Sequence, residues 1–346
     1  MNFSKTITSW YAVNKRDLPW RRTQNPYFIW LSEIILQQTQ IKQGLPYYER
    51  FVAYYPTVFD LAKAEETEVL KLWEGLGYYS RARNLHFTAK YVVNELKGEF
   101  PKNYKGLLQL KGVGDYTASA IASICYNEAA AVVDGNVYRV LSRYFGIDTP
   151  INTTNGIKTF KGLAQQLLPN GDIGDYNQAI MEFGARQCKP KAPDCQVCPL
   201  DASCVALEKA TIRSLPVKLK KLKITKRYFN FLAVFSQTDT VLIEQRLSKG
   251  IWQQLYQLPL VETDSSTTQD ELIRNTRFLE IVNHQNFTIT LFNDKDIVHK
   301  LSHQHLFTKF WIVNVPQLGN DAIAINTIRN YPVPILISKF LDAYKL

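Results

Sequence analysis

The chain has 346 residues, a formal net charge of +10 and a hydrophobic fraction of 46%. This length exceeds what one hydrophobic core usually holds, so we expect two domains. The longest apolar runs are only strand-sized, which excludes a membrane-spanning protein, and the start Met1-Asn2-Phe3-Ser4 carries no apolar signal segment. We therefore expect a cytoplasmic protein without membrane contact, and its positive charge points to a polyanionic partner.

The first part of the chain has the pattern of helices. Apolar residues recur at helical spacing, between Gly and Pro residues, over 26–48, 57–73, 81–96, 104–109 and 116–126. We expect residues 1–210 to form an all-α domain. Residues 211–227 are expected to be a basic linker, because seven basic residues and no acidic one occur between Thr211 and Asn230.

The remaining residues, 228–346, have the pattern of an α+β domain. Short runs rich in aromatic and β-branched residues predict strands at 228–235, 240–245, 287–292 and 307–315. Helical patterns occur at 268–279 and 333–344. The sequence thus predicts a multidomain protein, with an all-α domain followed by an α+β domain.

A cluster of cysteines lies near the middle of the chain, at Cys188, Cys195, Cys198 and Cys204. Four thiolates gathered so closely suit either one Zn²⁺ ion or a cubane iron–sulfur cluster. The gap between the first two is wide for paired zinc ligands, so the spacing favours a [4Fe–4S] cluster, with zinc as the alternative. Disulfides are disfavoured because nothing indicates an oxidising compartment.

The segment Leu110-Lys111-Gly112-Val113-Gly114-Asp115 separates two helical patterns. Two glycines around one apolar residue predict a tight hairpin whose valine enters the core. Such a turn leaves backbone N–H groups at the next helix N-terminus free to bind an anion, and a DNA phosphate would suit. The alternative is an ordinary interhelical turn.

Two carboxyl groups lie in contrasting sequence surroundings. Asp134 ends the apolar run 129–133 and opens a helical pattern, so it is expected to cap that helix and to have a depressed pKa. Glu33 lies in the apolar run 29–36, where desolvation should raise its pKa. One protonated and one ionised carboxyl group is the arrangement that cleaves a glycosidic bond through an oxocarbenium-like state.

Together these features resemble the helix-hairpin-helix DNA glycosylase superfamily, and within it the MutY adenine DNA glycosylases. The matching motifs occur in family order between residues 18 and 204. They are Leu18-Pro19-Trp20-Arg21, Trp30-Leu31-Ser32-Glu33, Gln37-Gln38-Thr39, Gly75-Leu76-Gly77-Tyr78-Tyr79-Ser80-Arg81-Ala82-Arg83-Asn84-Leu85 and Val133-Asp134-Gly135-Asn136-Val137.

The resemblance implies a role for each catalytic residue. Glu33 would protonate adenine at N7, and Asp134 would stabilise or trap the sugar cation. Asn136 and Tyr116 would orient these two carboxyl groups. Family members that also nick the strand carry a lysine at position 116, whose amine forms a Schiff base, so Tyr116 implies a monofunctional enzyme that uses water.

It also implies which residues bind DNA once adenine is flipped out of the duplex. Trp20 and Arg21 would line the adenine pocket, and the segments Gln37-Gln38-Thr39 and Leu76-Gly77-Tyr78 would enter the duplex near the lesion. Lys111, with Gly112, Val113 and Gly114, would hold phosphate, as would Lys189 and Lys191 in the cysteine segment. Taken singly and without the motifs, Trp20 and Tyr78 are better explained as core aromatic residues and Arg21 as a surface charge.

Residues 228–346 resemble the Nudix-like domain with which this family reads 8-oxoguanine. Nothing between Leu260 and Asn286 supplies the acidic helix that holds Mg²⁺ in a Nudix hydrolase, so we expect a reader domain. Ser302 and His303 keep the hydrogen-bonding pair of the family's lesion-reading loop, whereas Leu301 stands where the family usually has phenylalanine.

The resemblance therefore implies a monomeric DNA repair enzyme with a [4Fe–4S] cluster, associated with a bacterial nucleoid. Its substrate would be double-stranded DNA with 8-oxoguanine:A or G:A mispairs, and a sliding clamp or mismatch-repair protein is a candidate partner. Two alternatives remain. One is a bifunctional pyrimidine glycosylase-lyase, which Tyr116 disfavours; the other is a cluster-bearing DNA-binding protein without catalysis, which the Glu33 and Asp134 pair disfavours.

Overall fold

A computed structural model describes residues 2–219 and 224–346. The chain forms two compact units, each of them discontinuous in sequence. The first comprises Met1–Lys63 and Asn84–Lys220, and the second comprises Ala64–Arg83 and Lys221–Leu346. Three lysines of the expected linker, Lys220, Lys221 and Lys223, lie outside the described residues.

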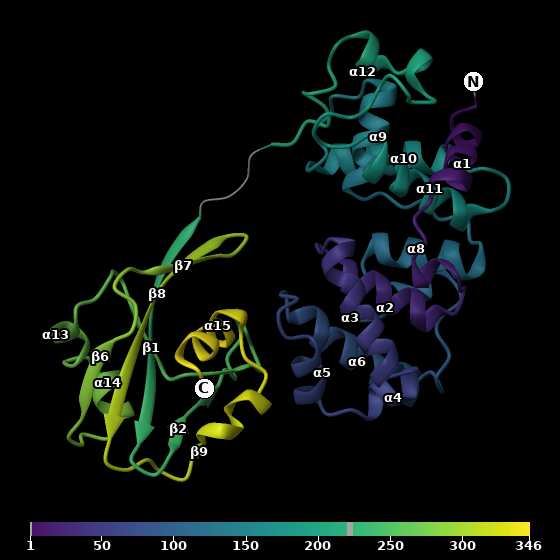
Figure 1. Ribbon diagram of the computed structural model, residues 1–346. Coiled ribbons are helices and arrows are strands. Elements are labelled where there is room, and N and C mark those ends of the chain that lie inside the picture. Colours follow the sequence, from purple (N-terminus) through teal and green to yellow (C-terminus); the bar gives the residue numbers. More distant parts are fainter. Residues whose placement is uncertain (1, 220–223) are drawn as a thin grey trace. The chain divides into compact units, whose positions relative to one another are not determined.

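The first unit is built from helices (Figure 1). Their bounds are α1 (Phe3–Asn14), α2 (Pro26–Leu36), α3 (Ile41–Tyr54), α4 (Val58–Lys63), α6 (Ser80–Asn94, which begins in the second unit), α7 (Tyr104–Leu107), α8 (Asp115–Tyr126), α9 (Gly135–Phe145), α10 (Thr154–Gln166), α11 (Ile173–Arg186) and α12 (Val205–Glu208), with 3₁₀ turns η1 (Pro19–Arg21) and η2 (Asp201–Ser203). One apolar core joins α1, α8, α9, α10 and α11.

Helix α9 illustrates how the sequence forms these elements. Val137, Val140 and Leu141 recur at helical spacing and are buried. Asp134 caps its N-terminus, and Gly146 ends it in the left-handed conformation, with φ of 67°. The carboxylate that caps this helix is thereby held at the edge of the core.

Three of the expected helices are each divided into two, and the first two of them lie in the N-terminal part of the chain. The pattern over 26–48 corresponds to α2 and α3, because Gln38 takes a φ of 53° and breaks the helical course. The pattern over 57–73 corresponds to α4 and α5 (Glu66–Leu72), because Glu65 starts a new helix through a capping box with Glu68. Apolar periodicity continued across both breaks, so it did not show them.

The second unit combines α5 with a mixed sheet. Its strands are β1 (Thr225–Ser236), β2 (Thr240–Leu242), β5 (Leu260–Thr263), β6 (Thr288–Leu291), β7 (Ile297–Lys300), β8 (Gln304–Val315) and β9 (Ala322–Ala324), with β3 (Glu244–Gln245) and β4 (Tyr256–Gln257) in a separate pair. The order is β6-β8-β1-β2-β9, while β5 also pairs with β1 and β7 with β8. Strands β1 and β8 run parallel along their full length. Strand β1 begins at Thr225, within the range expected to be linker.

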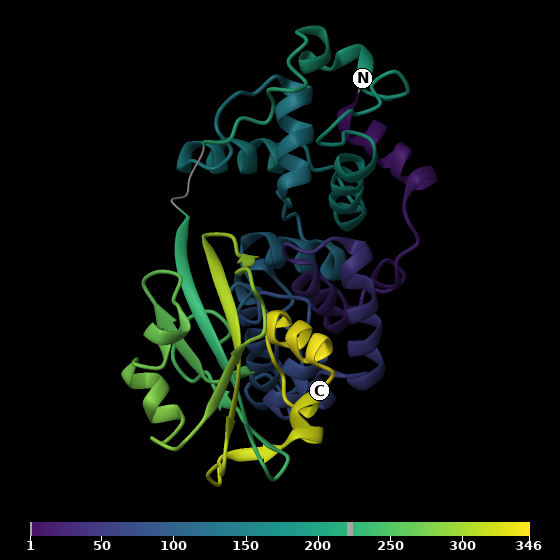
Figure 2. The ribbon, with the colours of Figure 1, turned by 60° about the vertical axis from the view of Figure 1, so that its left-hand side comes forward.

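Helices cover both faces of this sheet (Figure 2). Helices α13 (Gln269–Leu272) and α14 (Thr276–Ile281), which replace the single helix expected over 268–279, pack on one face through Leu272 and Phe278. Helix α15 (Ile335–Tyr344) packs on the other, where the Phe340 ring stacks on Phe310 at 4.4 Å between centroids. The turn η3 (Ile325–Asn330) precedes it. The structure confirms the prediction of a helical domain followed by an α+β domain.

Residues 64–83 belong to the second unit through specific contacts. Arg83 Nη1 donates to the carbonyl oxygen of Gln253 at 2.7 Å, and the Tyr79 hydroxyl donates to that of Val333 at 3.3 Å. Throughout residues 2–219 and 224–346, no helix is both long and apolar enough to cross a membrane.

Candidate active site and DNA-binding surface

A cavity of about 570 Å³ in the first unit gathers side chains that are distant in sequence. Helix α2 contributes Glu33, helix α8 contributes Tyr116, and the start of α9 contributes Asp134 and Asn136. The residues expected to line an adenine pocket, Trp20 and Arg21, are in its wall, as is Thr39. The structure thus brings together the catalytic and base-binding candidates.

The surroundings of Glu33 favour its neutral form. Burial raises its pKa to about 7, the nearby Asp134 carboxylate adds to the rise, and a hydrogen bond with Tyr116 offsets part of it. This agrees with the raised pKa that the apolar run predicts. A carboxyl group with a pKa near neutrality can donate a proton at physiological pH.

Asp134 is fixed by hydrogen bonds from the helix that it caps. Its Oδ1 accepts from the backbone N–H groups of Asn136 and Val137 at 2.9 and 2.8 Å, and its Oδ2 accepts from Asn136 Nδ2 at 2.7 Å. The prediction of a depressed pKa for Asp134 is wrong. Burial raises the pKa of Asp134 and outweighs these hydrogen bonds, which favour the anion.

Tyr116 interacts with both carboxyl groups and forms a hydrogen bond with Glu33. Burial, together with the charges of Glu33 and Asp134, raises its pKa, so the phenol stays protonated. Its hydroxyl also contacts Met181 Sδ at 3.2 Å. A protonated phenol is a hydrogen-bond donor and has no amine with which to attack a sugar carbon.

The glycine hairpin lies between α7 and α8. It contacts the chain directly after α2, where the helical course is broken. Val113 is buried, as expected, and Gly112 takes a φ of +82°, which favours glycine. Gln37 Nε2 lies 3.4 Å from the Gly112 carbonyl oxygen and 3.3 Å from Thr117 Oγ1. Lys111 is exposed and its Nζ lies 4.2 Å from the Phe87 ring centroid.

Two buried arginines of α9 hold the cysteine segment. Arg143 Nη1 donates to Cys188 Sγ at 3.4 Å and to the Lys189 carbonyl oxygen at 2.7 Å. Arg139 Nε donates to the Cys188 carbonyl oxygen at 2.7 Å, and its Nη2 donates to Asn136 Oδ1 at 2.8 Å. The start of α9 and the cysteine segment are therefore tied together.

The four cysteines are close enough to interact. Burial raises the pKa of Cys198 to about 11, and the charges of Cys188, Cys204 and Cys195 add to this rise. Within the described residues, no three His, Cys, Asp or Glu side chains are placed to hold one metal ion. A cubane takes four thiolates, each through a different iron, and the four free cysteines of this segment supply that donor set. Lys189 and Lys191 are exposed beside them.

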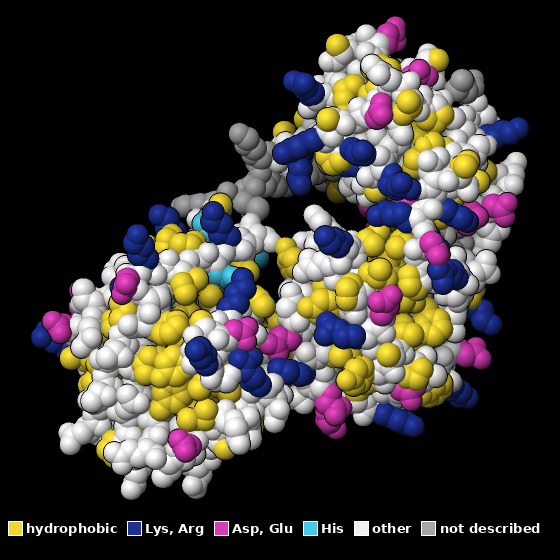
Figure 3. Space-filling view, viewed as in Figure 1, with side chains coloured by type: hydrophobic (Ala, Val, Ile, Leu, Met, Phe, Trp, Pro, Cys, Tyr) yellow, Lys and Arg dark blue, Asp and Glu magenta, His cyan; other side chains and the backbone are white. Residues whose placement is uncertain are grey.

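In the second unit, one of the expected lesion-reading residues, Ser302, contacts the 64–83 segment. The Tyr78 and Ser302 hydroxyl groups lie 2.7 Å apart, and Tyr78 is 47% exposed. Gly77 has a φ of +77°, while Leu76 is buried. His303 is exposed. Figure 3 shows histidine, lysine and arginine side chains gathered over the end of this unit where β7 and β8 lie.

Several residues at the site were not found from the sequence. Glu182 and Arg16 line the cavity, and Glu182 is 1% exposed. The sequence did carry a signal for Glu182, because this acid interrupts the apolar run from Ala179 to Phe183, just as Glu33 interrupts an apolar run of its own. Arg139 and Arg143 gave no comparable signal, since buried arginines on a helix look like surface charges in the sequence.

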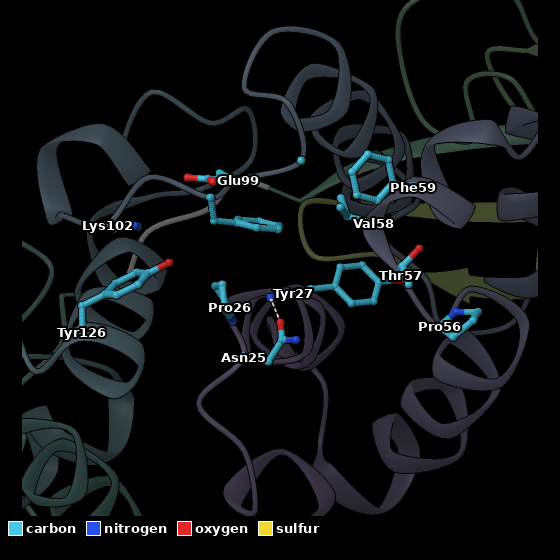
Figure 4. A pocket seen from close by; sticks show the side chains of 12 residues that line it. Asn25, Pro26, Tyr27, Pro56, Thr57, Val58, Phe59, Glu99, Lys102 and Tyr126 are labelled. Carbon is cyan, nitrogen blue, oxygen red and sulfur yellow. Dashed lines mark hydrogen bonds between the residues drawn. The ribbon is translucent and has the colours of Figure 1, made fainter.

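A second cavity, of about 440 Å³, lies at the beginning of α2 (Figure 4). Asn25 caps the helix there by accepting from the Tyr27 N–H at 2.9 Å. Of the residues around it, Glu99 and Lys102 carry formal charges. It lacks the pair of carboxyl groups that the larger cavity offers for glycosidic cleavage.

Comparisons with known proteins agree with this geometry. Residues 31–164 match the HhH-GPD superfamily of base excision DNA repair proteins, and residues 230–343 match the NUDIX domain. An adenine DNA glycosylase of Buchnera aphidicola subsp. Baizongia pistaciae is 33% identical, over 90% of this chain and 86% of its own. The human adenine DNA glycosylase is 46% identical, over 60% of this chain and 40% of its own.

Solved structures also resemble the chain. A thermostable thymine-DNA glycosylase has a TM-score of 0.56 at 35% identity, over 60% of this chain and 95% of its own. A non-covalent endonuclease III–DNA complex, at 22% identity and a TM-score of 0.52, covers 60% of this chain and 94% of its own and shares the fold.

The fold and the cavity define a base excision repair DNA glycosylase, a hydrolase of N-glycosidic bonds, joined to a NUDIX domain. Because similarity at 33% identity extends over 90% of its residues, the chain belongs to the adenine DNA glycosylase family.

Proposed function

We propose that this chain is a monofunctional glycosylase that hydrolyses the N-glycosidic bond of adenine mispaired with 8-oxoguanine or G in duplex DNA. The observation that supports this most is the pairing, in one cavity, of Glu33 with a pKa of about 7 and Asp134 at a helix N-terminus. A carboxylic acid and a carboxylate on either side of a glycosidic bond are the groups that this reaction requires.

The reaction then proceeds through the chain's own residues. Glu33 donates its proton to adenine N7, so that the bond between C1′ and N9 breaks with its electron pair on the base. The Asp134 carboxylate stabilises the resulting sugar cation or traps it covalently, and water then adds at C1′. Tyr116 and Asn136 hold the two carboxyl groups in place through the hydrogen bonds described above.

Duplexes that carry 8-oxoguanine:A, G:A and thymine glycol:A distinguish this function from its alternatives. The purified protein should release adenine from the first two and leave the third intact. The strand should stay uncut until alkali is added, and borohydride should trap almost no covalent complex, because Tyr116 cannot form a Schiff base. Excision from thymine glycol:A, or efficient trapping, would favour a glycosylase-lyase, and no excision at all would favour a non-catalytic DNA-binding protein.

The four cysteines of residues 188–204 would hold a [4Fe–4S] cluster, and what supports this is their proximity and their spacing. Bound there, the cluster would anchor the segment that carries the exposed Lys189 and Lys191. Purified protein should contain about four irons per chain and absorb at ~400 nm. Stoichiometric zinc without iron would contradict the assignment.

The remaining DNA contacts are proposed from exposure and backbone geometry. The hairpin of Gly112, Val113 and Gly114, with Lys111, would hold a phosphate at the start of α8. Gln37, Gln38 and Thr39 would enter the duplex at the break between α2 and α3, and the exposed Tyr78 would do so from the second unit. Ser302 and His303 would contact 8-oxoguanine.

A further inference from the structure

A buried group of charges adjoins the catalytic pair. Glu182, on α11, is 1% exposed and accepts from Arg16 at three atoms: the backbone N–H at 3.1 Å, Nε at 2.7 Å and Nη2 at 2.5 Å. It also accepts from Arg21 Nη2 at 2.8 Å. All three side chains line the cavity that holds Glu33 and Asp134. The mechanism above assigns Glu182 no role.

Glu182 is ionised across the working pH range. Burial alone would raise its pKa, but the hydrogen bonds from Arg16 and Arg21 lower it to about 2. Two guanidinium groups against one carboxylate leave a net positive charge in the wall of the cavity. Such a group is costly to bury unless its hydrogen bonds fix the geometry well.

The geometry fixes Arg21 in particular. Besides its bond to Glu182, Arg21 donates from Nη1 to the carbonyl oxygen of Arg16 at 3.0 Å, and its guanidinium lies 5.3 Å from the Tyr11 ring centroid. The Arg21 side chain is 12% exposed. A guanidinium carries five N–H donors, and these two bonds leave others available to a ligand in the cavity.

We propose that Glu182 is a positioning residue that holds Arg21 in the orientation in which it recognises the flipped base. A guanidinium only donates hydrogen bonds, so the group that it recognises is a ring-nitrogen acceptor of the purine. Without Glu182, Arg21 keeps its charge but has more than one orientation available, and base binding loses the energy of a preorganised contact. This inference rests on the proposed adenine excision.

The test separates binding of the base from binding of DNA. One duplex carries uncleavable 2′-fluoro-2′-deoxyadenosine opposite 8-oxoguanine, and the other carries a tetrahydrofuran abasic analogue at the same position. For Glu182→Gln, affinity for the first duplex should fall about tenfold, which is the loss of one charge-assisted contact. Affinity for the second should stay within about twofold of wild type.

Asp17→Asn is the matched control, because it removes the carboxylate of an exposed ion pair with Arg22 in the same N-terminal segment. It should change neither affinity. Should Glu182→Gln not fold, Glu182→Asp keeps the charge and withdraws the carboxylate from Arg21, and the same contrast between the two duplexes is expected. Equal losses on both duplexes, or no loss on either, would overturn the proposal.

A double-mutant cycle tests whether Glu182 acts through Arg21. In an Arg21→Met background, Glu182→Gln should add less than about twofold to the loss on the adenine duplex. A full additional tenfold loss would mean that Glu182 acts by another route. Failure of the wild-type protein to excise adenine would instead overturn the proposed function, so the two failures are distinguishable.

Discussion

At the scale of single residues, the site depends on how burial acts on titratable groups. Glu33 and Asp134 both lose solvation, but Asp134 receives three hydrogen bonds that favour its anion, whereas Glu33 shares one with Tyr116. Burial raises the pKa of both groups, and that of Glu33 reaches about 7. More hydrogen bonds favour the anion at Asp134 than at Glu33, and this difference distinguishes the two carboxyl groups in the cavity.

The pKa of Glu33 predicts how excision depends on pH. Single-turnover excision of adenine opposite 8-oxoguanine should fall as pH rises through about 7, because Glu33 loses the proton that it must donate. Glu33→Gln should bind the same duplex with unchanged affinity and lose roughly a thousandfold or more in rate. A flat profile between pH 6 and 8 in the wild type, or a Gln variant within a few fold of it, would contradict the assignment.

The same residue should cost the protein stability from about neutral pH upward. Because its pKa is raised on folding, the folded state binds more protons, and stability falls as pH rises toward about 7. Glu33→Gln has no such group. The free energy of unfolding of Glu33→Gln minus that of the wild type should therefore be larger at pH 8 than at pH 5, by roughly 2–3 kcal/mol. Urea denaturation at both pH values measures this difference, and a difference that is the same at both would contradict the prediction.

At the scale of helices and strands, aromatic stacking attaches α15 to the sheet. The Phe340 ring lies 4.4 Å from Phe310 and 5.6 Å from Tyr344 between centroids, and Phe340 is buried. Phe340→Ala should destabilise the second unit by about 3–5 kcal/mol, because the cavity that it leaves is enclosed. Guanidinium denaturation followed by near-ultraviolet circular dichroism would show this. The control variant Phe340→Leu should lose much less stability, because leucine fills more of the space than alanine does.

The sequence predicted elements better than it predicted their interruptions. Apolar periodicity located α6, α8 and α15, because each presents one buried face to a core. It missed the break at Gln38, since a left-handed glutamine leaves no local signature, and the break is what places Gln37 beside the hairpin. Short strands such as β5 and β9 were missed because pairing partners distant in sequence define them.

The cavity was also only partly predictable. Glu33 and Asp134 could be inferred from an acid in an apolar run and from an N-cap, which are local patterns. The ion pairs of Glu182 with Arg16 and Arg21 join residues more than 150 positions apart in the chain. No local pattern gives such a pairing, and the sign of the Asp134 pKa shift depended on burial that the sequence did not reveal.

At the scale of the whole molecule, discrimination among mispairs should depend on the second unit. The double variant Ser302→Ala, His303→Ala should reduce the preference for 8-oxoguanine:A over G:A, because it removes two polar side chains expected to read the lesion. Excision from G:A should stay close to wild type. Parallel single-turnover kinetics on the two duplexes measure the ratio, and an unchanged ratio would mean that other residues read the lesion.

The discontinuity of the second unit has a consequence for synthesis on the ribosome. Residues 64–83 leave the exit tunnel well before residues 221–346 are made, and yet they belong to the same compact unit. Until then, Tyr79 and Arg83 lack the carbonyl oxygens of Val333 and Gln253 to which they donate. Completion of the second unit therefore waits for the C-terminal residues that supply these two acceptors.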